Sequence, residues 1–326
     1  MNPDSTPFPQ PPPLVEPRYD DPTVLPWAPP PRPKFQHRYT RHLIFLALTF
    51  FTTTFAPAFE YVFASIGTDV PALAGFTWEM FRAGLWYSIP LLIILGAHEF
   101  GHYFACRYHD VDATLPYFLP APLPLTGTFG AVIRIREAFP SRKALFDIGV
   151  AGPIGGFVML VPFLVYGIMH SRVIPMPHGG DMLWLGEPLL LKGLMRLQFG
   201  NLGDDFTIVL HPVGQAAWWG MLATALNLMP FGQLDGGHLA YAVLGRRASW
   251  ISMGTLAAAL VLTFNSSSWV SVTVMMLVMS VFLGFRHPRV RDEITPIGRN
   301  RLIVFALAWV IFALCFMPVP LAIVNN

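Results

Sequence analysis

The chain has 326 residues, of which 54% are hydrophobic and 12% are charged. Ordinary soluble domains carry about 25% charged residues, so the composition favours a protein that lies largely in lipid. The formal net charge of +2 gives no reason to expect a nucleic-acid partner. The two cysteines, Cys106 and Cys315, both fall in apolar runs, which argues against a disulfide framework.

The first segment, residues 1–37, contains 13 prolines and almost no periodic apolar pattern. Such a segment cannot bury a core, so we expect a disordered, Pro-rich cytoplasmic tail. Polyproline structure could also let the tail recruit a partner. From residue 38 to residue 326 we expect one membrane domain.

Apolar runs that are candidates for membrane spans follow the tail, an upright helix needing about 20 residues to cross the hydrocarbon core. They occur at 42–63, 84–106, 144–169, 206–229, 250–265, 268–285 and 301–323. Two of these runs are short and His211 and Pro212 interrupt another, so we expect about 6–8 spans. The predicted fold class is an all-α polytopic membrane protein with a small β element.

The arginines and lysines near the spans are distributed unevenly. If the N-terminus is cytoplasmic, alternating the spans places most of them on the cytoplasmic side, as the positive-inside rule requires. Only Arg82, Arg172, Lys192 and Arg196 then lie near the opposite face. The tail also contains acidic residues, which organelle transit peptides avoid. We therefore expect a multi-pass protein of the bacterial cytoplasmic membrane with its N-terminus in the cytoplasm.

Residues 112–140 break the helical pattern. Prolines and glycines between Pro116 and Gly130 forbid a helix although the stretch stays apolar. Residues 131–136 then alternate apolar and basic side chains, which is typical of a strand. We expect a re-entrant or interfacial β element here, with an interfacial loop as the alternative.

The loop at 171–205 carries a Leu-rich patch between Leu189 and Leu197. Its amphipathic pattern predicts a short helix that lies on the bilayer surface. The loop is too short to form a separate folded domain.

The residues that can carry chemistry begin in the second apolar run, which reads His98-Glu99-Phe100-Gly101-His102. Two histidines four residues apart lie on one face of a helix, so both imidazoles can reach one metal ion. Glu99 can then act as a general base without ligating the metal, as in the His-Glu-x-x-His zinc proteases. Polar groups in an apolar helix are functional candidates by default. The alternative is a pair of histidines hydrogen-bonded to neighbouring spans.

A third ligand is needed, and Asp235 is the best candidate. It follows Pro230 and Gly232 in a stretch that interrupts an apolar span. Such a break exposes backbone at membrane depth, which implies burial against protein or water. A carboxylate at the break can meet the metal. Alternatively, Asp235 is part of a turn and caps the helix that continues at His238.

Together these residues resemble the site-2 protease family of intramembrane zinc metalloproteases. The resemblance covers most of residues 84–245, the expected catalytic core. It is carried by the run from His98 to His102, by Ala151-Gly152-Pro153-Ile154-Gly155-Gly156, and by Asn227 through Gly237 with its Asn-x-x-Pro and Leu-Asp-Gly-Gly elements. The glycines of the second piece would let its helix pack closely against the metal-binding helix.

The resemblance implies one zinc ion bound by His98, His102 and Asp235, with Glu99 as the catalytic residue. It also implies that Asn227 helps to hold the substrate or the developing oxyanion, although a buried asparagine that bonds a helix break is an alternative. Some family members contain a PDZ-type peptide-binding domain or nucleotide-sensing regulatory domains. Neither fits this chain, so we expect a compact form in which the membrane core or the tail selects substrates.

The implied activity is hydrolysis of peptide bonds within or near transmembrane segments of membrane proteins, as in regulated intramembrane proteolysis. The expected partners are such substrates and the lipid bilayer. An unwound substrate could pair with the edge of the predicted strand, which makes Val132 and Ile133 candidate substrate-binding residues.

Two other functions are compatible with parts of the pattern. A non-catalytic chaperone or sequestering protein of the same fold would bind transmembrane segments, but an altered Glu99 or ligand would favour that function, and all four polar groups are present. A metal transporter would spread acidic and histidine ligands along a path through several spans. In this chain the candidate histidine and acidic ligands gather at one depth in the membrane instead.

Overall fold

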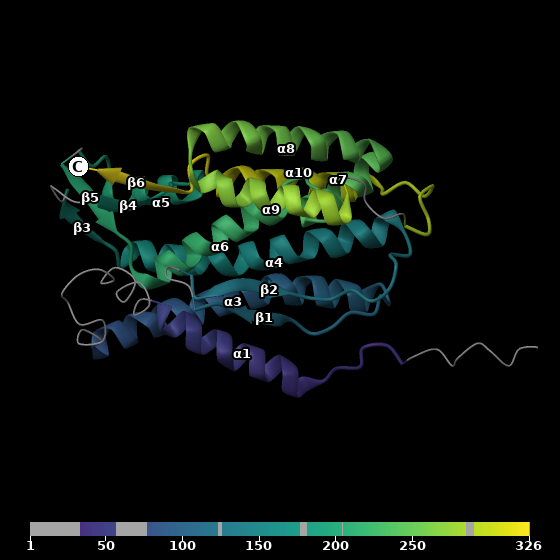
Figure 1. Ribbon diagram of the computed structural model, residues 1–326, viewed down its shortest axis with the longest axis horizontal. Helices are drawn as coiled ribbons and strands as arrows, with labels where there is room; N and C mark the ends of the chain where they lie inside the picture. Colours follow the sequence, from purple (N-terminus) through teal and green to yellow (C-terminus); the bar gives the residue numbers. More distant parts are fainter. Residues whose placement is uncertain are drawn as a thin grey trace, which may run out of the picture. The chain divides into compact units, whose positions relative to one another are not determined.

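The computed structural model describes residues 33–56, 77–122, 126–176, 181–203, 205–284 and 290–325 (Figure 1). Most of the described residues are helical, and residues 1–32 of the predicted tail lie outside the described part. The helices are α1 (Tyr39–Thr54), α3 (Trp78–Tyr108), α4 (Arg142–Met169), α5 (Leu189–Phe199), α6 (Pro212–Leu228), α7 (Asp235–Leu244), α8 (Ala248–Asn265), α9 (Ser268–Leu283) and α10 (Arg299–Cys315). The strands are β1 (Tyr117–Pro120), β2 (Thr128–Val132), β3 (Arg172–Pro175), β4 (Asp181–Leu185), β5 (Phe206–Val209) and β6 (Leu321–Asn325).

Among the described residues, 3 helices are long and apolar enough to cross a membrane: Trp78–Tyr108, Arg142–Met169 and Asp235–Asn265. The last of these joins α7 and α8 through the 3-10 turn Gly245–Arg247. The predicted runs 84–106, 144–169 and 250–265 all fall within these helices. Ser268–Phe282 is a shorter apolar helix. The described part therefore does not confirm the predicted 6–8 spans.

Two predicted spans were wrong at one end. The run 206–229 begins as strand β5, and its helix starts only at Pro212. The run predicted over 301–323 is helical only as far as Cys315, because Pro318 and Pro320 cannot continue the helix and the chain then enters β6. For the run 42–63, α1 ends at Thr54, and residues 57–63 lie outside the described residues.

Helices α3, α4 and α6 pack against one another and form the centre of the unit Phe35–Asn326. Their contact is filled by fully buried side chains such as Leu145, Leu160, Trp218 and Met221. The indole N–H of Trp218 donates to the carbonyl of Gly186, 2.7 Å away, so its one polar atom is satisfied. This packed core holds α3, the helix that carries both histidines, against its two neighbours.

A β element is present where one was predicted, but its bounds differ. Strands β1 and β2 form an antiparallel hairpin, and β2 covers Thr128–Val132 rather than residues 131–136. Pairing continues past β2 in an irregular form, because the N–H of Thr114 donates to the carbonyl of Arg134 and the N–H of Arg136 donates to the carbonyl of Asp112. The alternating pattern thus marked the end of the hairpin rather than its centre.

The predicted helix around Leu189–Leu197 is confirmed as α5. The sequence did not predict the two antiparallel ribbons beside it, β3 with β5 and β4 with β6. In each ribbon the second strand comes from a distant segment, and that segment had been assigned to a membrane span. Local hydropathy could not reveal these pairings.

Candidate metal centre

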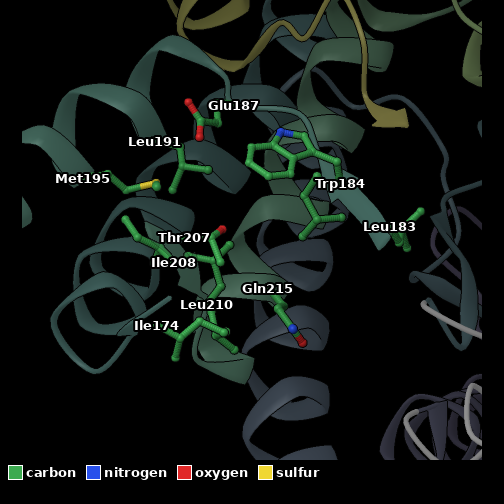
Figure 2. A pocket seen from close by; sticks show the side chains of 12 residues that line it. Ile174, Leu183, Trp184, Glu187, Leu191, Met195, Thr207, Ile208, Leu210 and Gln215 are labelled. Atoms are coloured by element: carbon green, nitrogen blue, oxygen red, sulfur yellow. The ribbon is translucent and has the colours of Figure 1, made fainter. Parts of the chain in front are cut away.

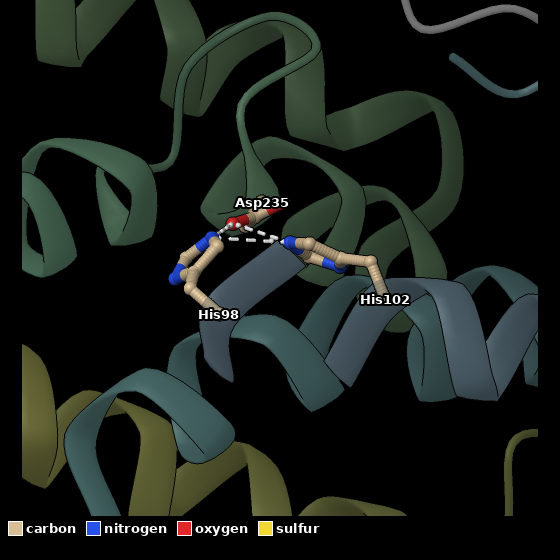
Figure 3. A group of neighbouring side chains, drawn as sticks. All are labelled: His98, His102 and Asp235. Carbon is tan, nitrogen blue, oxygen red and sulfur yellow. Dashed lines mark hydrogen bonds and ion pairs between the residues drawn. The ribbon is translucent and has the colours of Figure 1, made fainter. Parts of the chain in front are cut away.

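Three potential metal ligands come from two helices that are far apart in the sequence. His98 and His102 lie one turn apart on α3, and Asp235 is the first residue of α7 (Figure 3). Nε2 of His98 lies 3.1 Å from Oδ2 of Asp235 and 3.1 Å from Nε2 of His102. Nε2 of His102 lies 3.3 Å from the same carboxylate oxygen. The structure therefore brings together the three residues for which the sequence suggested one site.

The spacing of these atoms suits a zinc ion. Tetrahedral zinc with Zn–N bonds of about 2.0 Å places neighbouring ligand atoms about 3.3 Å apart. The observed separations of 3.1 Å and 3.3 Å match that edge length. His98 is 6% exposed and His102 is 7% exposed, so the ligands lie in a protected site. Two imidazoles and one carboxylate form a donor set that fits zinc and leaves a fourth position open.

The orientation of His102 is fixed by the neighbouring helix α4. Its Nδ1 lies 2.6 Å from the carbonyl oxygen of Ile148. A carbonyl can only accept, so Nδ1 must carry the proton and Nε2 is left with a free lone pair. Metal-binding histidines commonly have such a partner, which fixes both the tautomer and the ring orientation.

Glu99 lies beside the three ligands without joining them. Its carboxylate oxygen Oε1 is 4.0 Å from Nε2 of His98, and the residue is 8% exposed. The backbone N–H of Ile133 hydrogen-bonds the Glu99 carboxylate. Glu99 is thus held by the segment that follows β2, within reach of a reacting group near the ligands. This position suits a proton acceptor better than a fourth ligand.

Glycines on α4 allow this helix to pack closely against α3, the helix that carries both histidines. A Cβ atom at Gly152 would overlap the imidazole ring of His102, and one at Gly156 would lie 3.1 Å from Cβ of His98. A Cβ at Gly155 would lie 2.8 Å from the carbonyl oxygen of Ala97 on α3. The glycines of this segment therefore have the packing role that the sequence suggested, and they lie directly against the imidazoles.

The helix break before Asp235 is stabilised by α8. Helix α6 ends at Leu228, α7 begins at Asp235, and Gly232 between them has a φ of 51°, which favours glycine. The N–H of Gly232 donates to the hydroxyl of Ser252, and the hydroxyl of Thr255 donates to the carbonyl of Pro230. The backbone exposed by the break is thus bonded to protein, and the carboxylate is presented at the start of a helix.

The remaining predicted site residues lie at different distances from the ligands. Nδ2 of Asn227, near the end of α6, is 3.3 Å from Nε2 of His98, so its amide is part of the cluster. Val132 ends strand β2 and is 45% exposed. Ile133 follows β2, and its backbone N–H bonds the carboxylate of Glu99.

Sequence reasoning missed a polar cluster that anchors α4 close to the ligands. Asp147 accepts hydrogen bonds from Nε and Nη2 of Arg301, at 2.8 Å and 2.6 Å, and its Oδ2 lies 2.9 Å from Nε2 of His109. The next residue, Ile148, supplies the carbonyl that orients His102. The sequence does show a carboxylate, Asp147, at the start of an apolar run. Only the fold reveals that its partners are Arg301 on α10 and His109 at the end of α3.

Comparison with known proteins gives a consistent family assignment. The family model described as peptidase family M50 matches residues 86–264. Probable zinc metalloprotease EGY2, chloroplastic, of Oryza sativa subsp. indica is 32% identical over 177 residues, which is 52% of this chain and 31% of that protein. No solved structure matches the chain.

Two relatives in Arabidopsis thaliana match over a longer stretch. Probable zinc metalloprotease EGY2, chloroplastic, is 29% identical over 257 residues, covering 76% of this chain and 44% of that protein. Probable zinc metalloprotease EGY1, chloroplastic, is 28% identical over 255 residues, covering 73% of this chain and 43% of that protein. The chain therefore spans less than half the length of these curated relatives.

Proposed function

We propose that this chain, which belongs to peptidase family M50, is a zinc metalloendopeptidase that cleaves membrane proteins within or near their transmembrane segments. One observation carries the proposal. Two imidazoles and a carboxylate meet in a buried site with zinc-like spacing, and Glu99 lies beside them.

Each polar group in the site has a distinct part in the proposed reaction. Zinc held by His98, His102 and Asp235 would supply Lewis acidity that polarises the substrate carbonyl and activates water. Glu99 takes up the proton of the attacking water and returns it to the leaving amine. The amide of Asn227 donates to the substrate carbonyl as negative charge develops on its oxygen.

The substrate must reach this site in an extended form, because the carbonyls of a helix are bonded within the helix. Strand β2 offers an edge beside α3, and Val132 at its end is half exposed. In our proposal the unwound substrate pairs along β2 near Val132. Ile133 holds the base Glu99 in place through its backbone N–H.

The membrane topology completes the proposal. The described part contains helices α1, α6, α9 and α10 in addition to the three long spans, and with them the domain over residues 38–326 crosses the bilayer about 6–8 times. Its core is residues 84–245, its N-terminus is cytoplasmic, and the Pro-rich tail precedes it. The bacterial cytoplasmic membrane stays a prediction from the sequence, and the relatives compared, which are named as chloroplastic plant proteins, lend it no support.

The test expresses Glu99→Gln or Glu79→Gln in cells and compares the membrane-protein fragments that the cells produce. Both residues lie on α3, but Glu79 is in its exposed first turn, so it is a matched control. We expect Glu99→Gln to lower fragment production about 10²- to 10⁴-fold while the purified protein keeps its zinc. Unchanged fragments in a zinc-loaded Glu99→Gln protein would instead favour the non-catalytic chaperone.

A further inference from the structure

A cavity lies beside α5, between strands β4 and β5, and has a volume of about 230 Å³ (Figure 2). Leu191 and Met195 of α5 form one wall of this cavity. Gln215, in the first turn of α6, lines it from another side. None of these residues contributes to the metal centre, so the cavity is a separate feature of the molecule.

The cavity is lined by successive residues of both strands. These are Leu183, Trp184 and Leu185 of β4, and Thr207, Ile208 and Val209 of β5. Side chains alternate between the two faces of a strand, so a cavity that only touched a face would contact every second residue. Ile174 of β3, the register partner of Thr207, also lines the cavity, so the β3–β5 ribbon contributes part of a face. We take β4 and β5 to border the cavity with their edges as well.

Each of these strands has a partner on one side only among the described residues. Strand β4 pairs with β6, and strand β5 pairs with β3. No backbone hydrogen bond in the described part joins β4 to β5. Figure 2 shows β6 in yellow on the side of Trp184 away from Ile208. Both walls thus present backbone N–H and C=O groups, which an added strand can pair with.

The side chains around the cavity suit a peptide with apolar residues and an acidic group. The walls are mainly aliphatic or aromatic, and Leu191 is 2% exposed. A neighbouring cavity of about 480 Å³ shares Trp184, Thr207 and the acidic Glu187 with it and adds Lys192 and Arg196, so basic groups outnumber the one carboxylate there. A lipid chain could fill the apolar part but would leave the strand edges unpaired. A peptide backbone satisfies them, and its acidic side chain can meet the basic residues.

The position of the cavity relative to the metal centre suggests which peptide it binds. Gln215 lines the cavity, and Asn227 on the same helix is 3.3 Å from His98. At 1.5 Å per residue, their separation of 12 positions spans about 18 Å along α6. A single substrate chain can therefore occupy both sites, with a stretch of membrane helix between them.

We propose that the cavity between β4 and β5 binds, by strand addition, an extended segment flanking the membrane helix of a substrate. The proposal rests on the proposed function for the identity of the occupant. Peptide binding itself is independent of catalysis, so the two can be tested apart. The preferred segment has alternating aliphatic residues and an acidic residue towards Lys192 and Arg196.

The experiment uses the full chain carrying Glu99→Gln, in detergent, so that nothing is cleaved. The probe is a fluorescent peptide of about eight residues, a typical strand length, with alternating valine and threonine and one glutamate. Its control has the same side chains but N-methylated backbone amides. We expect the N-methylated peptide to bind at least about tenfold more weakly, since it cannot donate to the strand edges.

Matched variants place the binding in this cavity. Ile208 and Val173 are register partners in one ribbon, but only Ile208 lines the cavity. We expect Ile208→Lys to weaken peptide binding at least about tenfold, while Val173→Lys stays within about twofold of the parent. Equal binding of the two peptides, or unchanged binding in Ile208→Lys, would overturn the proposal. Peptide binding together with unchanged fragments in the Glu99→Gln cells described above would leave the cavity assigned and refute only the protease.

Discussion

The metal centre and the region of ribbons around α5 are built in opposite ways. At the metal centre, polar groups already have partners: the carbonyl of Ile148 accepts from His102, and Ser252 and Thr255 bond the helix break. In the ribbon region, β4 and β5 each keep one edge without a strand partner among the described residues. The metal centre is thus built to enclose one metal ion, whereas the ribbon region leaves strand edges to which an extended peptide can bind.

This difference shows how one membrane domain can place the catalytic reaction and the selection of substrates in separate regions. A metal site needs ligands held within a few tenths of an ångström, so its surroundings must be rigid. A site that accepts various peptides can bind them through their backbone N–H and C=O groups, because every peptide has these groups whatever its sequence. Because the two regions share no residues, changes in them should have additive effects. The predictions below test that independence, starting with the largest effect.

Replacing Asp235 with Asn should remove zinc almost completely. The substitution takes the charge from the one carboxylate that meets both imidazoles, so zinc affinity should fall more than about 100-fold, beyond the usual effect of outer groups. A competing chelating indicator measures that affinity. Asp205→Asn, in the ribbon region next to β5, is the matched control and should keep full zinc affinity. Parallel loss in both variants would contradict the separation of the regions.

Replacing Gly152 with Ala should have the next largest effect. The added methyl group would overlap the ring of His102, and overpacking costs about 1–3 kcal/mol, so zinc affinity should fall about tenfold or more. Gly193 on α5 has open space where a Cβ would stand. Gly193→Ala should therefore leave zinc affinity unchanged and slightly raise thermal stability. Equal zinc affinity in the two variants would show that α4 can shift to make room for the added methyl group without displacing His102.

Replacing Asp147 with Asn should weaken zinc binding indirectly, by about tenfold. The variant loses the charged partner of Arg301 and His109, which lets α4 shift and moves the carbonyl that orients His102. Zinc titration is the measurement. Asp112→Asn is the control, because Asp112 pairs with Arg136 at 3.2 Å on a different element. A loss of thermal stability without any change in zinc affinity would refute this positioning role.

The sequence predicted the centre of the site because its signals are local. The spacing of His98 and His102 needs only a helix, and the break before Asp235 is visible in Pro230 and the glycines around it. The link between the two helices came from family resemblance, since no local pattern states which break faces which helix. The structure then brings them within hydrogen-bonding distance.

The parts that could not be predicted depend on partners distant in the sequence. Residues 206–209 are apolar like a membrane span, and only pairing with β3 makes them a strand. The same holds for Leu321–Asn325, which pairs with β4. No local pattern reveals the role of Asp147, because its partners His109 and Arg301 lie 38 and 154 positions away. Hydropathy and spacing contain no information on such contacts.

The smallest expected effect concerns the segment that precedes α1 and packs beside the metal-bearing region. The backbone N–H of Phe35 donates to Asp112, 2.7 Å away, and Nε2 of His37 lies 3.0 Å from the hydroxyl of Tyr103. Burial lowers the pKa of His37, and the nearby His42 and Arg136 lower it further. The attached segment therefore favours the neutral imidazole.

Acidification should loosen this segment. Because the pKa of His37 is lower in the folded chain than its ordinary value of about 6.5, the contact is strongest above that pH and weakens as pH falls through the lowered pKa. Amide exchange of residues 35–39, corrected for its intrinsic pH dependence, should rise on acidification. His37→Gln removes the titrating group, so its exchange should change less with pH. If both proteins respond alike, then another group controls the attachment, and the segment's stability is independent of His37.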